Sequence, residues 1–180
     1  MTTAVKQSPL VPHSRVHPIG VQLPSSETML IGALLYSNPH DRLTVVSTVH
    51  DGDVESPYLR TLLGLVRDRA RGTREVDGAL IADDLLRSGK LSGEHGVRLS
   101  KCLTDAITCA ASGEAVMSYA AAVVGQAYRR RYESLGAALT ELAASLPEHE
   151  LLGYLVRAGS ECRDHEKRLT SLREASGAAA

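Results

Sequence analysis

The stretch GEAVMSYAAAVVGQAYRRRYESLGAALTELAASL, residues 113–146, contains no helix breaker stronger than glycine. Apolar side chains recur in it every three or four residues, which is the period of one face of an α-helix. The stretch therefore predicts a single helix of about nine turns that ends before Pro147. Its apolar stripe consists of Val116, Ala120, Val123, Ala127, Leu135, Leu139, Leu142 and Leu146.

A second apolar stripe follows Pro147 and comprises Leu152, Leu155, Val156, Cys162 and Leu169. Two long helices joined by a tight break form an antiparallel hairpin. We expect this hairpin to occupy residues 112–172 and a flexible tail to follow at residues 173–180.

The residues before the hairpin predict short helices with recognisable starts. Ser25, Asn38, Ser56 and Asp77 are good N-caps, and proline stands at the first helical position after two of them. Gly89 suits the left-handed end of the helix that Asp77 opens. Because no stretch alternates as a strand does, we predict an all-α fold. It consists of a small globular bundle of short helices at residues 25–111, followed by the long antiparallel helical hairpin.

Residues 1–24 differ from the rest of the chain. They contain four prolines, Lys6 and Arg15, and no acidic residue. Proline removes a backbone donor and interrupts helices, so we expect a disordered or extended basic arm here.

Composition limits the class of protein. Hydrophobic residues make up 43% of the chain, but Phe and Trp are absent, so Leu, Val, Ile and Ala must fill the core. A formal net charge of −1 excludes a global electrostatic field that would draw the protein to nucleic acid or membrane.

We expect no membrane association, because no apolar run can span a bilayer or form a signal-peptide core. The expected location is the cytoplasm, with nucleoid association left open.

Catalytic and metal-binding patterns are missing from the sequence. It has no G-x-S-x-G, no H-E-x-x-H, no C-x-x-C and no Gly-rich nucleotide loop. Cys162 and His165 are three residues apart, but a structural zinc site needs four ligands. We therefore expect no enzyme, no cofactor and no metal. Three cysteines within helical patterns indicate reduced thiols.

The hairpin raises a problem of burial, because the five short helices are needed to cover one another. Apolar surface left in water costs about 25 cal/mol per Å². Pairing with a second copy would remove this cost, most simply with two-fold symmetry. We therefore predict a homodimer whose interface contains Val116, Ala120, Val123, Tyr128, Tyr132, Leu155, Val156 and Cys162.

Two arginine-rich stretches allow two interpretations each. RDRARGTR contains Arg67, Arg69, Arg71 and Arg74, and YRRRY contains Arg129, Arg130 and Arg131. The arginines of the first stretch could complement the negative end of a helix, and those of the second could form a solvated belt. Alternatively, both stretches could form contacts, either with phosphates or an acidic partner or, in the second stretch, by stacking of the arginines with Tyr128 and Tyr132 at a dimer contact.

Three segments together resemble the N-terminal domain of bacterial replicative helicases of the DnaB family. They are SSETMLIGALL at 25–35, VDGALIADDLLRSGKL at 76–91 and ASGEAVMSYAAAVVGQAYRRR at 111–131. The resemblance covers residues 20–170. The chain departs from the family in DVESPYLR, residues 53–60, where Val54 replaces an aromatic residue. The helicase motor's phosphate loop, G-x-x-x-x-G-K-[ST], does not occur. An excised helicase domain and a separate protein are both consistent with this, and the start MTTAVKQ favours the separate protein.

The resemblance implies a non-enzymatic protein-interaction and oligomerisation module, similar to the helicase collar, that acts in or regulates DNA replication. Its expected partners are a second copy of itself, as a dimer or a larger ring, and the replicative helicase, primase or helicase loader. The alternative is a small DNA-binding regulator that uses the arginine-rich loop and the basic arm.

Overall fold

The computed structural model describes residues 23–177, so most of the predicted arm and the last three residues of the predicted tail lie outside it. The described residues form helices and turns and contain no strand, which confirms the all-α prediction. The helices are α1 (Ser26–Tyr36), α2 (Pro39–Thr48), α3 (Pro57–Arg71), α4 (Gly78–Arg87), α5 (Gly93–Thr108), α6 (Val116–Ser145) and α7 (Glu148–Ala175), with 3₁₀ turns η1 (Asp51–Asp53) and η2 (Gly113–Ala115).

The short helices begin at the predicted caps. In each case the side-chain oxygen of the cap accepts a hydrogen bond from a backbone N–H of the first turn, which has no partner within the helix. Gly89 follows α4 with φ +68°, the left-handed conformation expected of a glycine at a helix end. Ser25 accepts from the backbone N–H of Thr28, Asn38 from that of Asp41, Ser56 from that of Leu59, and Asp77 from that of Ala79.

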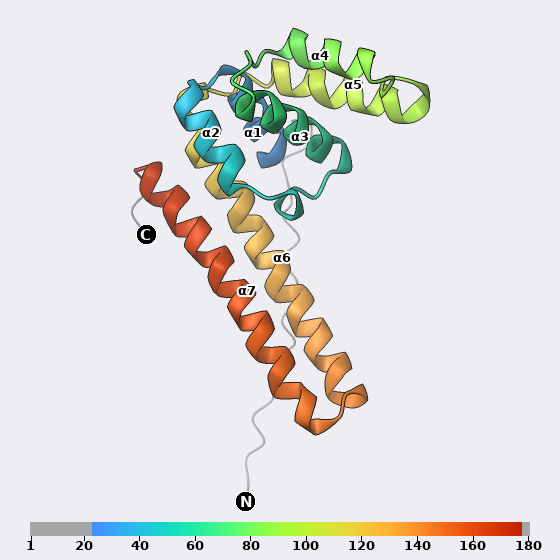
Figure 1. Cartoon of the computed structure of the whole chain (residues 1–180), viewed down its shortest axis with the longest axis vertical. Helices are drawn as coiled ribbons and strands as arrows, with labels where there is room; N and C mark the ends of the chain where they lie inside the picture. The colour runs from blue at the N-terminus through green and yellow to red at the C-terminus, as the bar shows by residue number, and fades with distance from the viewer. Residues whose placement is uncertain (1–22, 178–180) are drawn as a thin grey trace, which may run out of the picture.

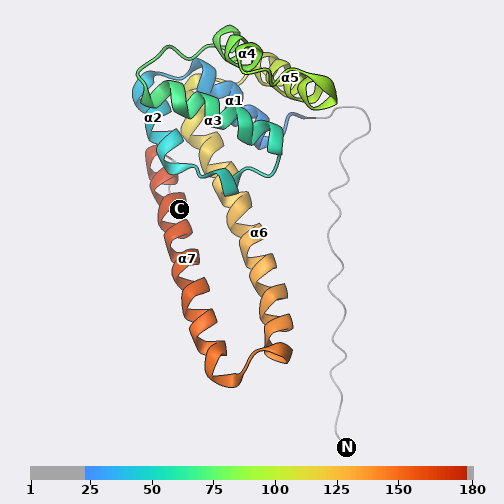
Figure 2. The same cartoon turned by 45° about the vertical axis from the view of Figure 1, so that its right-hand side comes forward.

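The five short helices gather at one end of the molecule, and α6 and α7 run away from them as an antiparallel pair (Figure 1). Figure 2 shows the same separation after a turn of 45°. The first half of α6 lies against α1 and α2, and α7 returns to contact α2. The far end of the hairpin is therefore a two-helix layer that no other described helix covers.

One apolar core joins the bundle to the base of the hairpin. Val116 and Val123 of α6, and Leu169 and Leu172 of α7, belong to the same buried cluster as the leucines of α1 and α3. The core thus continues across the expected boundary between residues 111 and 112. The hairpin also extends beyond its predicted end at residue 172, because α7 continues to Ala175.

Burial changes sharply along the hairpin. None of the residues 128–161 is buried, whereas both helices contribute buried residues on the bundle side of this segment. Within it the two helices meet through half-buried side chains that include Leu135, Leu142, Leu151 and Tyr154. The outer half of the hairpin therefore has a seam between two helices and no enclosed core.

Candidate functional site

A buried carboxylate anchors the hairpin to the bundle. Asp53 lies in η1 with 3% of its surface exposed. Arg168 of α7 donates to both of its oxygens, from Nη1 at 2.5 Å and from Nη2 at 3.1 Å, and also to the Thr48 carbonyl at 2.9 Å. The backbone N–H of His50 donates to the same carboxylate at 2.7 Å. These contacts supply the partners that a buried charge requires.

His165 lies one turn before Arg168 and is also buried. Its Nε2 lies 2.9 Å from the carbonyl oxygen of Val124 on α6. A carbonyl only accepts hydrogen bonds, so Nε2 carries the proton and donates. The imidazole ring also lies against the ring of Tyr128, with centroids 5.3 Å apart. His165 therefore joins the two helices where the buried part of the hairpin ends.

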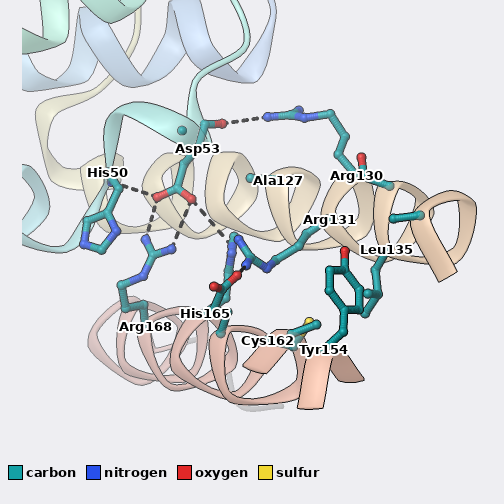
Figure 3. Close-up of a pocket in the computed structure, with 15 residues that line it drawn as sticks. His50, Asp53, Ala127, Arg130, Arg131, Leu135, Tyr154, Cys162, His165 and Arg168 are labelled. Atoms are coloured by element: carbon teal, nitrogen blue, oxygen red, sulfur yellow. Dashed lines mark hydrogen bonds and ion pairs between the residues drawn. The ribbon is translucent and has the colours of Figure 1, made fainter. Parts of the chain in front are cut away.

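A groove of about 770 Å³ opens beside this network, between η1 and the two hairpin helices (Figure 3). Arg131 of α6 pairs across it with Glu161 of α7. Arg130 donates to the Asp53 carbonyl at 2.7 Å, and Arg168 is held by the Asp53 carboxylate. Because its three arginines are already bonded to groups of the chain, the groove offers a phosphate no unengaged arginine.

The hairpin also carries an exposed apolar surface, which we call the tip face and define as Tyr132, Leu152, Leu155 and Val156. Their exposed fractions are 49%, 68%, 46% and 59%. Leu152, Leu155 and Val156 are three and four residues apart, so they lie along one side of α7. None of the four lines the groove. The tip face is therefore a separate surface of the hairpin with no catalytic group in its definition.

Tyr132 is held in place by its neighbour one turn earlier. The hydroxyls of Tyr128 and Tyr132 are 3.0 Å apart, and the rings meet edge to face with centroids separated by 4.9 Å. The hydrogen bond to Tyr132, and then burial, raise the pKa of Tyr128 to about 12. The phenol of Tyr128 is therefore protonated across the physiological range, and its ring and hydroxyl both contact Tyr132 of the tip face.

The structure corrects half of the predicted dimer interface. Val116, Ala120 and Val123 are at most 1% exposed because the bundle covers the first half of α6. Cys162 is buried as well and lines the groove. A second copy could not reach Val116, Ala120 and Val123 without displacing the chain's own core, and Cys162 is only 5% exposed where it lines the groove. The other predicted positions, Tyr128, Tyr132, Leu155 and Val156, lie in the outer half of the hairpin, where they remain half-buried or exposed.

Two arginines of the first basic stretch serve the fold. Arg69 is 8% exposed, forms a two-point ion pair with Asp84, and donates to the carbonyls of Glu75 and Leu80. Arg67 donates to the carbonyls of Val46 and Val49. These contacts agree with the interpretation in which Arg67 and Arg69 serve the bundle, and contact of the two side chains with phosphates or an acidic partner stays a prediction.

The remaining arginines divide into two groups. Arg71, Arg74 and Arg129 are exposed, so the structure leaves them accessible to solvent. Arg130 and Arg131 are half-buried and bonded within the chain, as described for the groove. The predicted cationic surface is thus reduced from seven arginines to three that are exposed.

Sequence reasoning missed the group of Asp53, His165 and Arg168, in which the Asp53 carboxylate binds Arg168 and lies 3.7 Å from His165 Nε2. The DGD sequence at residues 51–53 interrupts the helical pattern, but nothing local relates Asp53 to a residue 115 positions later. Among residues 23–177, no group of three or more His, Cys, Asp and Glu side chains is arranged to hold a metal ion. Cys162 and His165, which the sequence places three residues apart, are both buried, and His165 Nε2 is bonded to the Val124 carbonyl.

Within the described residues, no single helix is long and apolar enough to cross a membrane. One pair, α5 together with residues 113–145, reaches that length and apolarity only jointly, across a bend of 105°. Protein-family models, curated proteins and solved structures yield no match to this chain. The chemistry and exposure of the hairpin must therefore carry the functional proposal.

Proposed function

We propose that this protein is a non-enzymatic interaction module that works by docking its hairpin onto protein partners. The partners are a second copy of the chain and a component of the DNA replication machinery: the replicative helicase, the primase or the helicase loader. The family resemblance of the sequence supplies the replication context. The exposed tip face is the observation that carries the docking role.

A layer of two helices leaves one side of each helix without a packing partner. Burial of an apolar surface contributes about 25 cal/mol per Å², and Leu152, Leu155 and Val156 forgo much of this in the isolated chain. Clustered exposed apolar side chains on a soluble protein are typical of interaction sites. A partner that lies along α7 would provide the third layer that this half of the hairpin lacks.

The order of elements agrees with the same proposal. A bundle of short helices precedes a long hairpin, as the resemblance to the helicase N-terminal domain implies. The buried Asp53–Arg168 pair holds α7 on the bundle, so the hairpin projects as a fixed arm. A rigid surface loses less conformational entropy on binding than a mobile one.

The alternative function, a small DNA-binding regulator, receives less support. Arg67 and Arg69 are engaged inside the bundle, and only Arg71 and Arg74 of that stretch are exposed. Binding to duplex DNA would fall with salt at a log–log slope of about −0.9 for each phosphate neutralised. We expect no such binding at physiological ionic strength, measured by fluorescence anisotropy with a labelled duplex.

Affinity capture tests the proposed partners directly. Purified helicase, primase and loader are each passed over the immobilised wild-type chain and over the tip-face variant Leu152→Glu/Leu155→Glu/Val156→Glu. We expect the wild type to retain at least one of the three proteins and the variant to lose it. Retention of none at near-physiological salt, or equal retention by both chains, would reject the proposal.

A further inference from the structure

The tip face has a chemistry that restricts what can cover it. It combines the exposed ring of Tyr132 with the apolar row on α7, and Glu148 lies one turn before Leu152 on the same side of that helix. The surrounding segment, residues 132–161, contains five glutamates and one arginine. Glu161 is paired with Arg131, but Glu133, Glu141, Glu148 and Glu150 are all exposed. A complementary occupant is therefore apolar and basic.

Residues 1–22 of the same chain have this composition. They contain eight Met, Ala, Val, Leu and Ile residues, together with Lys6 and Arg15, and no Asp or Glu. Pro9-Leu10-Val11-Pro12 is a P-x-x-P sequence, with Arg15 three residues after it. Such sequences dock as polyproline II helices in grooves lined by aromatic rings. Tyr132, which is 49% exposed, offers one aromatic ring to such a sequence.

The segment also starts from the correct place to reach the tip face. Ser26, at the start of α1, accepts a hydrogen bond from Gln126 of α6 at 3.1 Å, so the described chain begins beside α6 at the base of the hairpin. Tyr132 lies six residues further along that helix, which is about 9 Å. The end of α6 at Ser145 lies about 29 Å away. An extended segment of 22 residues spans up to about 75 Å, so its length is sufficient.

We infer that residues 1–22 dock onto the tip face of their own hairpin, with the P-x-x-P sequence against Tyr132 and the α7 row and with Arg15 among the glutamates. The segment then competes with any protein partner for this surface. This inference rests on the proposed function for its consequence, namely that the amino-terminal segment regulates docking. The contact itself is a property of the free chain and can be measured separately.

Photo-crosslinking of the full chain tests the contact. A benzophenone amino acid replaces Val11, and an equal mixture of ¹⁴N- and ¹⁵N-labelled chains is irradiated and analysed by mass spectrometry. We expect crosslinks to peptides of residues 132–159 with a single isotope label, which means that both ends belong to one chain. The same probe in the tip-face variant should lose these crosslinks. Absence of crosslinks to this region overturns the inference, and so do mixed-isotope crosslinks, which place the segment on a second copy.

Self-association measures the consequence. The arm variant Leu10→Asp/Val11→Asp/Arg15→Glu keeps the full length of the chain but replaces apolar and basic side chains that complement the tip face. Its matched control is Ser8→Thr/Ser14→Thr. If the segment covers the tip face nine-tenths of the time, the apparent dissociation constant of the wild-type dimer is raised about a hundredfold, because both copies must have the tip face open. Sedimentation velocity should therefore show association of the arm variant that is about a hundredfold tighter than that of the wild type, and no change for the control.

The two proposals fail in distinguishable ways. Equal dissociation constants for the arm variant and the wild type overturn the regulatory role of the segment, while the docking function stands. If neither the wild type nor the arm variant associates with itself or retains a replication protein, the proposed function fails. The isotope pattern of the crosslinks then still decides where residues 1–22 bind.

Discussion

Arg168 of α7 and Asp53 of η1 form a two-point ion pair in which the carboxylate is 4% exposed at its side chain. Their separation of 115 residues makes this pair a long-range connection between the hairpin and the bundle. The Arg168 guanidinium also binds the last carbonyl of α2, that of Thr48, and so compensates the negative end of that helix. This contact fastens α7 to the bundle beside the apolar core that Leu169 and Leu172 share with it.

Removal of one partner of this pair should strongly destabilise the protein. In Asp53→Ala the Arg168 guanidinium loses its buried counter-charge, and breaking a buried pair in this way costs about 3–5 kcal/mol. The measurement is the free energy of unfolding in urea, followed by circular dichroism. Asp164→Ala on the exposed side of α7 is the control and should change stability by less than about 0.5 kcal/mol. Equal effects of the two substitutions would show that the pair does not anchor the hairpin.

The Arg69–Asp84 pair should make the stability of the fold decrease as the pH falls into the acid range. The hydrogen bond from Arg69 lowers the pKa of the Asp84 carboxyl below its usual value near 3.9. A carboxyl with a lowered folded-state pKa stabilises the fold above its unfolded pKa and loses that contribution as the pH falls through the folded value. Asp84→Asn should therefore be less stable than the wild type by about 1.5–3 kcal/mol at pH 7.

The difference between Asp84→Asn and the wild type should narrow once the pH drops below about 4. Urea unfolding at a series of pH values measures it. Asp83→Asn is the matched control, because Asp83 forms an exposed pair with Arg87 one turn later, and such pairs contribute less than about 1 kcal/mol. A difference for Asp84→Asn that is constant from pH 7 to pH 3 would contradict the assignment.

Two glycines in helices should respond in opposite directions to alanine. A Cβ at Gly32 of α1 would lie 2.5 Å from the Ala106 carbonyl oxygen of α5 and 2.6 Å from Cys109 Sγ, so α1 and α5 would have to separate. Overpacking of this kind costs about 1–3 kcal/mol. A Cβ at Gly64 of α3 meets no atom within 4 Å. Gly64→Ala should instead raise stability by about 0.5–1 kcal/mol.

Thermal unfolding of Gly32→Ala and Gly64→Ala, compared with that of the wild type, tests these two predictions. The melting temperature should fall for the first and rise for the second. A rise for Gly32→Ala would mean that α1 and α5 are not in close contact, and the bundle described above would then be wrong in its central packing.

The starts of the helices could be predicted from the sequence because capping is a local interaction. Asp77 accepts from the backbone N–H of Ala79, two residues later, and the identity of the cap alone indicates it. The class of fold follows for the same reason, since helical period and breakers are local features. The length of the hairpin was also accessible, because Pro147 is the first strong breaker after residue 112.

The partners of each helix face could not be predicted in this way. Val123 and Leu155 belong to stripes that look alike in the sequence, yet one is covered by the bundle and the other is 46% exposed. The arginines show the same limit. Arg69 and Arg71 are close in the sequence, but Asp84 binds Arg69 and not Arg71, and Asp84 lies on the next helix. Long-range packing decides both cases.

The central claim is that the outer half of the hairpin docks through its tip face. Sedimentation equilibrium over a wide range of concentrations, on the full-length wild type and on Leu152→Glu/Leu155→Glu/Val156→Glu, tests it most directly. We predict that the mass of the wild type rises with concentration toward that of a dimer, while the variant stays monomeric with an unchanged circular dichroism spectrum. A wild-type mass that stays monomeric at every concentration, or a variant that associates equally well, would contradict the claim.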